Sequence, residues 1–453
     1  MTAHKIIDMT QGKILPILLR FAIPLVFGSL FQQLYTFADS AIVSNFVSND
    51  ALTAIGVTSS LNYLVLGLTM GSAIGFSIPI SQGVGKGSEE ETNKAFWNGL
   101  YLTLAIGLLV SIGVSPFVKP LLRLMNTSER LLDMATSYLT IIFIGQISTV
   151  LYNYLAGAIR AFGDSRSPFI FLVISGITNI LLDLLFVLVV PMGVSGVATA
   201  TVISQVISVL LCLWWFKKKK IIKKYSADGE KLYTPSSEYI RKICIIGLPL
   251  GLEYSICSIG NVVLQGSINT LGDAYATAQY CGERIRSFAT IPMESVGTAI
   301  ATFAAQNFGA KKYVRIKRGV KYCLIIQGAY CVISFPLLLL LERPLIYLLL
   351  GTNDTPEAML SAEYLTIISL LFIFHGSLMV FRNTVQGMGY SASTLASSAM
   401  EILGRSLSGI LAVHFSSFFL ICISAPMAWC LALICCTVLF SVYIRRVEGD
   451  RAK

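Results

Sequence analysis

About twelve stretches of this chain are apolar over roughly 20 residues or more, which is the length that a helix needs to cross a bilayer. They cover residues 15–44, 51–81, 96–118, 130–159, 168–190, 194–216, 240–270, 275–308, 319–341, 357–388, 393–414 and 418–444. In lipid each stretch can satisfy its own backbone only as a helix, and the alternation of a barrel strand is absent. The sequence therefore predicts an all-α integral membrane protein with twelve transmembrane helices.

The net charge of +10 follows the topology of the chain and does not indicate a nucleic-acid partner. If the N-terminus is cytoplasmic, the connections on that side carry about 26 of the 34 Lys and Arg residues, and the opposite side carries about four. This bias predicts a multi-pass plasma-membrane protein with both termini in the cytoplasm. The basic run at the start of Lys217–Lys242 is expected to face lipid headgroups.

The two halves of the chain repeat each other at an offset of about 226 residues. Tyr138–Ile142 (YLTII) returns as Tyr364–Ile368, and Pro24 followed by Leu25 returns as Pro249 followed by Leu250. The longest polar connection lies between the halves. We therefore predict an N-terminal lobe (1–216), a cytoplasmic linker (217–239) and a C-terminal lobe (240–453). Transporters use such parallel repeats, with binding sites near the midplane of the membrane.

Two acidic residues lie inside predicted spans of the first half, with no Lys or Arg at similar depth. Asp39 is in the last third of the first span, and Asp183 is near the middle of the fifth, one helical turn after Asn179. A charge at such depth costs about 2.5–3.5 kcal/mol on insertion scales. A pair of carboxylates there would share a proton or hold a monovalent cation. The alternatives are an interfacial position for Asp39 and a polar network that only packs helices.

The repeat does not duplicate this pair. The counterpart of Asp39 is Leu264 or Gln265, and the counterpart of Asp183 is Gly409. A fold that is symmetric while its acids are not suggests that the ion site lies in the first half only.

The second half carries other charges within its spans. Glu401 and Arg405 are spaced for a pair on one helix face, and Glu283 is expected to pair with Arg284 or Arg286. We interpret these pairs as structural or gating pairs.

Two further acids of the second half, Glu253 and Glu294, have no local basic partner. Each is expected either to face a central cavity and attract a cationic substrate, or simply to reach the membrane interface. No catalytic motif accompanies them, and the three histidines are far apart in the sequence. An enzyme is therefore not expected.

Several motifs together resemble the multidrug and toxic compound extrusion (MATE) family from Pro24 to about Leu433. They are FQQLY with Asp39-Ser40, GAIRAFGDS at 157–165, NILLD at 179–183, GVSGVATATVIS at 193–204, QNFGA at 306–310 and EILGR at 401–405. The resemblance implies two six-helix lobes around a V-shaped central cavity. It also implies export of cationic, amphipathic compounds against an inward Na⁺ or H⁺ gradient.

Carried over position by position, the family's coupling-ion site falls on five residues of the first half. They are Asp39, Asn153, Asn179, Asp183 and Thr201. The only cofactor expected is the coupling ion itself, Na⁺ or H⁺. Glu253 follows Pro249 too closely to match the key Glu of another branch, and Arg286 stands where many relatives have an acid.

The candidates for the substrate cavity come from both halves. They are Gln32, Gln33, Tyr35, Glu253, Met293 and Glu294. We expect a monomeric antiporter that exports organic cations by alternating access in exchange for Na⁺ or H⁺. The alternative is a flippase for lipid-linked precursors, which would need a basic cavity formed by Arg284, Arg286, Arg382 and Arg405.

Overall fold

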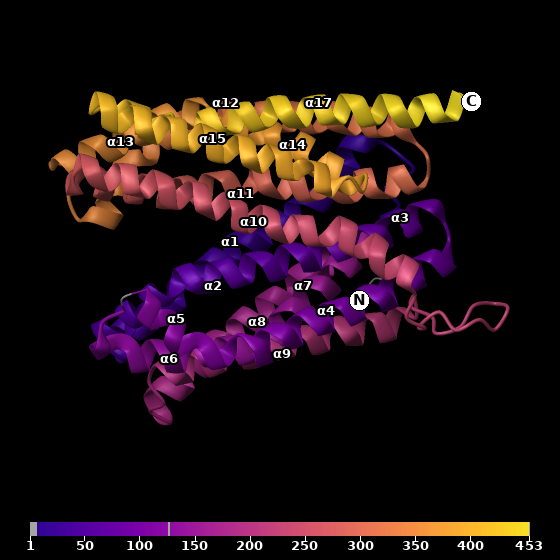
Figure 1. Cartoon of the computed structure of the whole chain (residues 1–453), viewed down its shortest axis with the longest axis horizontal. Helices are drawn as coiled ribbons and strands as arrows, with labels where there is room; N and C mark the ends of the chain where they lie inside the picture. Colours follow the sequence, from indigo (N-terminus) through magenta and orange to yellow (C-terminus); the bar gives the residue numbers. More distant parts are fainter. Residues whose placement is uncertain (1–6, 126, 453) are drawn as a thin grey trace. The chain divides into compact units, whose positions relative to one another are not determined.

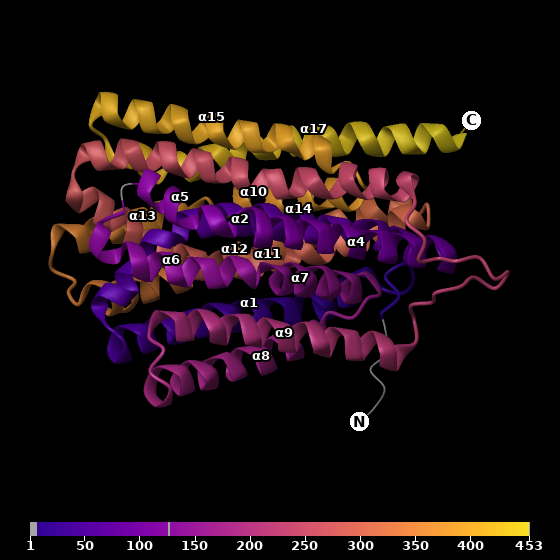
Figure 2. The ribbon, with the colours of Figure 1, turned by 60° about the horizontal axis from the view of Figure 1, so that its bottom comes forward.

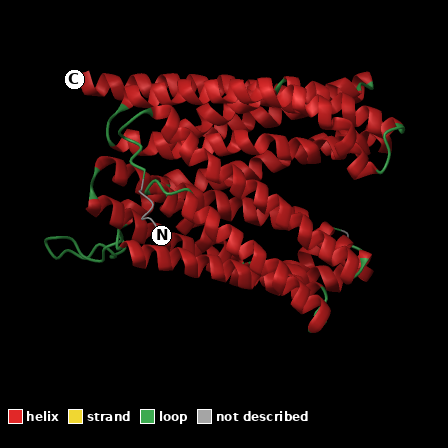
Figure 3. Cartoon of the chain, turned by 180° about the vertical axis from the view of Figure 1, so that it is seen from behind, coloured by secondary structure: helices red, strands yellow, loops and turns green. Residues whose placement is uncertain are grey.

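The computed structural model describes residues 7–125 and 127–452. Within these residues the protein consists of α-helices joined by loops, and no β-strand is present (Figure 3). Each of the twelve predicted spans lies on one helix, on a bent pair of helices, or on a helix with short helical segments beside it, such as α2 with α3 and α16 with α17. The predicted fold class, an all-α protein with twelve membrane helices, is confirmed.

The chain contacts divide the protein into two compact units. Unit 1 contains residues 1–8 and 27–252, and unit 2 contains residues 9–26 and 253–453. The division therefore falls inside two helices, α1 (Ile14–Phe46) and α10 (Ser237–Leu271), and not at the linker 217–239 of the predicted lobes.

Unit 1 holds ten helical segments between the second part of α1 and the first part of α10. They are α2 (Asn49–Phe76), α3 (Ile78–Lys86), α4 (Glu89–Gly113), η1 (Ser115–Phe117), α5 (Val118–Leu124), α6 (Glu129–Ile144), α7 (Gln146–Ala161), α8 (Arg166–Leu184), the short π-helix η2 (Leu185–Val189) and α9 (Val194–Lys219). α8 packs along α9, and α4 packs along α7 (Figures 1 and 2). Gly99 of α4 lies directly against the ring of Tyr154, whose hydroxyl donates to the Phe96 carbonyl at 2.6 Å.

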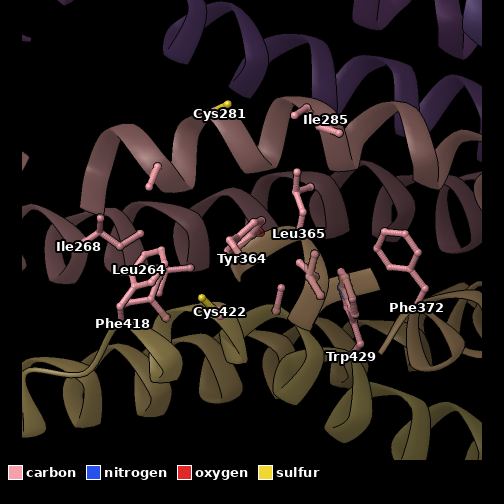
Figure 4. Packing of buried hydrophobic residues seen from close by; sticks show 14 of the residues in the cluster. Leu264, Ile268, Cys281, Ile285, Tyr364, Leu365, Phe372, Phe418, Cys422 and Trp429 are labelled. Atoms are coloured by element: carbon pink, nitrogen blue, oxygen red, sulfur yellow. The ribbon is translucent and has the colours of Figure 1, made fainter. Parts of the chain in front are cut away.

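Unit 2 contains seven helices after α10. They are α11 (Asp273–Gly309), α12 (Tyr313–Leu350), α13 (Pro356–Leu370), α14 (Phe372–Gly387), α15 (Ser391–Phe415), α16 (Phe418–Cys422) and α17 (Ser424–Ala452). Their apolar core is shown in Figure 4, where Tyr364, Phe372 and Trp429 lie among aliphatic side chains and cysteines. Gly282 of α11 allows the Tyr364 ring to approach, because a Cβ there would lie 2.2 Å from Tyr364 Cδ1.

Eight helices of the described residues are long and apolar enough to cross a membrane, and two bent pairs raise the number to ten. The bent pairs are α6 with α7 (43°) and α13 with α14 (48°). The two remaining predicted spans, α11 and α15, carry charged residues such as Glu283, Arg286 and Glu401 in their sequences. Within unit 2 these side chains are neutralised by ion pairs, so their charge does not argue against a membrane position.

The repeat seen in the sequence returns in the helix geometry. The bends lie at Gly145 and Leu371, which are 226 residues apart. Pro24 lies within α1 and Pro249 within α10, and each helix passes from one unit to the other within four residues after its proline. A proline removes a backbone hydrogen bond and weakens the turn before it. Both repeats therefore have a helix with a weakened turn just before its change of unit.

The connection between α9 and α10 is the long loop in Figure 3, and it is held on α4. The buried side chains of Asn93 and Asn98 accept from the backbone N–H groups of Lys223 and Ser236 at 2.6 and 2.8 Å. Lys94 pairs with Glu230 of the same loop at 3.0 Å. The loop is therefore part of unit 1 and not a free tether.

Candidate functional site

The first candidate site lies in unit 1, where α1 meets α8. Asn179 and Asp183 stand one turn apart on α8. With its amide nitrogen directed toward α1, Asn179 Nδ2 lies 3.1 Å from Oδ1 and 3.3 Å from Oδ2 of Asp39. The carboxyl groups of Asp39 and Asp183 lie close enough to interact electrostatically. Three of the five residues predicted for the coupling-ion site are thus side by side.

A glycine of α8 allows this approach. A Cβ on Gly176 would lie 2.5 Å from Cε1 of Phe31 on α1, so that only glycine lets the two helices come this close. Gly176 precedes Asn179 by one turn, which brings the polar residues of α8 against α1.

Asp183 is fully buried, and its two carboxyl oxygens have no hydrogen-bond donor among the described residues. Asp39 is half-buried beside it. Two adjoining carboxylates in an apolar surrounding repel each other unless a proton or a cation lies between them. The geometry is therefore that of an acidic site that can bind one positive charge.

A tyrosine that the sequence analysis did not assign to the site also lies here. Tyr138 of α6 is near the carboxyl groups of both Asp39 and Asp183. It is the first residue of the repeated YLTII motif, and its counterpart Tyr364 donates to a half-buried acid of unit 2, Glu283. The repeat was a usable signal, because in each unit this tyrosine faces a carboxyl group.

The other two predicted ion-site residues bond within their own helices. Asn153 Nδ2 donates to the Thr149 carbonyl at 2.8 Å, and Thr201 Oγ1 donates to the Val197 carbonyl at 3.0 Å. These bonds do not join them to the Asp39 carboxyl group. Their role in ion binding stays a prediction.

The candidate substrate residues differ in exposure. On α1, Gln32 is exposed, while Gln33 and Tyr35 are half-buried. On α11, the side chain of Glu294 is 58% exposed, whereas Met293 is fully buried in the core of unit 2. Met293 is therefore a packing residue in this conformation, because its helix turns it toward the core.

Glu253 has a basic partner that the sequence analysis did not assign to it. Its Oε1 lies 3.3 Å from Nη1 of Arg382 on α14, and both side chains are buried. The Arg382 guanidinium also bonds Glu401 of α15, which in turn accepts from Arg405 at 3.1 Å. Glu253 has no basic partner nearby in the sequence, as expected, but the fold supplies one from a distant helix.

The second group of charges in unit 2 surrounds Glu283 of α11. Glu283 pairs with Arg286 one turn later and accepts from the Tyr364 hydroxyl. Arg284 instead donates to the Tyr280 hydroxyl at 2.9 Å. Of the two partners expected for Glu283, the structure has Arg286, because residues three apart share a helix face and adjacent residues do not.

Comparison with known proteins identifies the family of this chain. The MatE family model matches residues 24–185 and 249–407, which is more than half of the chain. The chain belongs to the MatE family. The two matched segments begin at Pro24 and Pro249, the prolines of α1 and α10. The resemblance to MATE proteins that the sequence motifs indicated is confirmed.

Among its curated relatives are two proteins of Bacillus subtilis. The probable multidrug resistance protein YpnP is 28% identical over 387 residues, which cover 85% of each chain. The probable multidrug resistance protein YoeA is 25% identical over 392 residues, which cover 84% of each chain.

A solved structure has the same fold. It is the outward-facing conformation of a multidrug resistance MATE family transporter of the MOP superfamily. It superposes with a TM-score of 0.90 at 21% identity and covers 99% of this chain and 100% of that chain. This MatE protein is therefore a multi-pass membrane transporter and not an enzyme.

Proposed function

We propose that this MatE protein is an efflux antiporter that exports small cationic, amphipathic compounds in exchange for Na⁺ or H⁺. The observation that carries the proposal is the Asp39–Asp183 pair, two adjoining carboxyl groups in a membrane protein whose direct donor is a neutral amide. A site of this kind binds one positive charge in one step of a cycle and releases it in another. The names of YpnP and YoeA support a multidrug substrate range.

Each unit has an exposed candidate for substrate contact. Gln32 of unit 1 offers a hydrogen-bond acceptor, and Glu294 of unit 2 offers a negative charge for an organic cation. The coupling ion would bind Asp39 and Asp183 and would compete with the exported compound. In alternating access, each of the two ligands would favour a different conformational state of the transporter. We further propose that the protein is a monomer in the plasma membrane, with lipids along its apolar faces. The positive-inside bias supports a cytoplasmic position for both termini.

The flippase alternative is less well supported by the charges of unit 2. It requires free cationic groups, but Arg286, Arg382 and Arg405 are each bonded to a glutamate. Only Arg284, which contacts Tyr280, has no acidic partner among the described pairs. Displacement of a bound organic cation by a lipid-linked precursor would favour this alternative.

The test uses everted membrane vesicles and a fluorescent cationic dye, with Na⁺ and pH gradients imposed separately. Wild-type vesicles should accumulate dye under one of the two gradients, which identifies the coupling ion. Asp39→Asn and Asp183→Asn should each abolish the gradient-driven accumulation at unchanged expression. Wild-type rates in both variants would exclude the proposed coupling site.

A further inference from the structure

The buried charges of unit 2 form one connected network, which we call the Arg382 network. It consists of Glu253 of α10, Arg382 and Gln386 of α14, and Thr394, Glu401 and Arg405 of α15. Its charged side chains are 5–11% exposed. Two carboxylates and two guanidinium groups give it a net charge of zero.

Arg382 lies between the two carboxylates of this network. Its Nη1 faces Glu253 Oε1 at 3.3 Å, and its Nη2 bonds Glu401 Oε1. The remaining oxygen of Glu253 accepts from Gln386 Nε2 at 2.8 Å and from Thr394 Oγ1 at 3.0 Å. Apart from Arg382, the groups around Glu253 and Glu401 that supply oxygens are the two carboxylates and the Thr394 hydroxyl, which hard cations prefer as ligands, while Gln386 donates its amide N–H to Glu253.

The two units therefore differ in the group that lies beside their paired acids. In unit 1 the Asp39 and Asp183 carboxyl groups adjoin each other beside a neutral amide. In unit 2 a permanently charged guanidinium, which is never deprotonated in proteins, stands between the acids. In unit 1 the positive charge between the acids can be a proton or ion that is released in each cycle. In unit 2 the positive charge belongs to the Arg382 side chain and cannot be released.

We propose that Glu253, Glu401 and Thr394, with Gln386 holding Glu253 in place, form a cation site that the side chain of Arg382 fills permanently. Arg382 thereby keeps mobile ions out of unit 2 and confines ion coupling to unit 1. The part of this inference that concerns coupling rests on the proposed function. Replacing Arg382 with a shorter, neutral residue opens the site to a monovalent metal cation.

The experiment measures cation binding by thermal unfolding of the purified, full-length protein. The background is the double variant Asp39→Asn with Asp183→Asn, so that unit 1 lacks both acids of its proposed ion site. Arg382→Gln is added to this background, and unfolding midpoints are compared in NaCl, LiCl and choline chloride at equal ionic strength. Na⁺ or Li⁺ should raise the midpoint of the Arg382→Gln protein by about 2 °C or more over choline.

Three controls define what is specific to Arg382. The background protein and its Arg382→Lys derivative keep a cation in the site and should show no difference among the salts. Arg405→Gln removes one positive charge from the same network, but Arg405 bonds Glu401 and not Glu253, so that its loss should not create the site. An equal Na⁺ effect in Arg405→Gln, or any Na⁺ effect in the background protein, would overturn the proposal.

If Arg382→Gln is too unstable to purify, its yield is measured instead. Membranes are extracted in NaCl and in choline chloride, and the monodisperse protein is quantified by size exclusion. The proposal expects recovery in NaCl only, and equally low yield in both salts contradicts it. Because this experiment measures no transport, a result against the cation site in unit 2 leaves the antiport proposal intact. Wild-type efflux by the Asp39→Asn and Asp183→Asn proteins would reject the antiport proposal alone.

Discussion

Asn179 Nδ2 of α8 lies within 3.3 Å of both carboxyl oxygens of Asp39 on α1. A neutral donor that contacts both oxygens holds the carboxyl group in place without cancelling its charge. This arrangement keeps the acid available to a proton or an ion, and it ties the orientation of α1 to that of α8 in unit 1.

Asn179→Ala should weaken ion coupling. It removes a hydrogen bond to a carboxyl group, and bonds of this kind contribute about 1.5–3 kcal/mol when the acceptor is charged. The ion concentration for half-maximal dye efflux should therefore change by about tenfold or more in everted vesicles. Asn45→Ala is the matched control, because Asn45 is in no predicted site and its amide donates to the Ala41 carbonyl of its own helix. Equal effects of the two variants would show that the Asn179 contact has no special role.

Glu401→Gln should destabilise unit 2. Arg405 then has no carboxylate, and Arg382 loses one of its two, inside a buried network. Breaking a buried ion pair typically costs about 3–5 kcal/mol. A clear fall of the unfolding midpoint in detergent is expected. Glu448→Gln removes the partner of Lys317 in a pair that water reaches, and it should change stability by about 0–1 kcal/mol.

Two glycines of α2 should respond oppositely to alanine. A Cβ on Gly75 would lie 2.5 Å from the Cα of Gly247 on α10, so that Gly75→Ala forces the two helices apart and should cost about 1–3 kcal/mol. Gly56 has open space, so that Gly56→Ala should be neutral or stabilise the helix by up to about 1 kcal/mol. Unfolding midpoints of the two variants test this, and a Gly75→Ala protein as stable as wild type would disprove the close packing.

Asn98→Ala should release the loop between α9 and α10. Asn98 is fully buried and accepts from the N–H of Ser236, which would lose this partner. Limited trypsin digestion should therefore cut the basic loop faster in the variant than in wild type. Asn45→Ala is a suitable control, since the Asn45 amide bonds a carbonyl of α1 and is far from the loop in sequence. Unchanged cleavage in Asn98→Ala would mean that other contacts hold the loop.

The sequence was most informative where hydropathy and repetition decide the structure. The spans followed from hydropathy, because lipid allows only helices there. The acids Asp39 and Asp183 stood out, because few ionisable groups occur within spans and each is expensive. Their contact in unit 1 needs only that α1 and α8 turn one polar face toward each other.

Pairings between distant helices were not accessible in the same way. Glu401 with Arg405 follows from spacing on one helix, but Glu253 with Arg382 depends on how α10 and α14 are rotated in unit 2. Sequence spacing alone did not decide whether Arg284 or Arg286 pairs with Glu283, and the helix geometry was needed to choose Arg286. Tyr138 was visible as part of a repeat, but only the fold shows that it faces carboxyl groups.

The division of α1 and α10 has a consequence for how such a protein is made. Residues 9–26 precede the linker but belong to unit 2, and residues 240–252 follow it but belong to unit 1. A chain cut at the linker would give two fragments, each lacking a segment of its own unit and carrying one of the other's. During synthesis, unit 1 is therefore complete only when residues 240–252 of the second half have been made, and unit 2 must combine a segment made early with the helices made last.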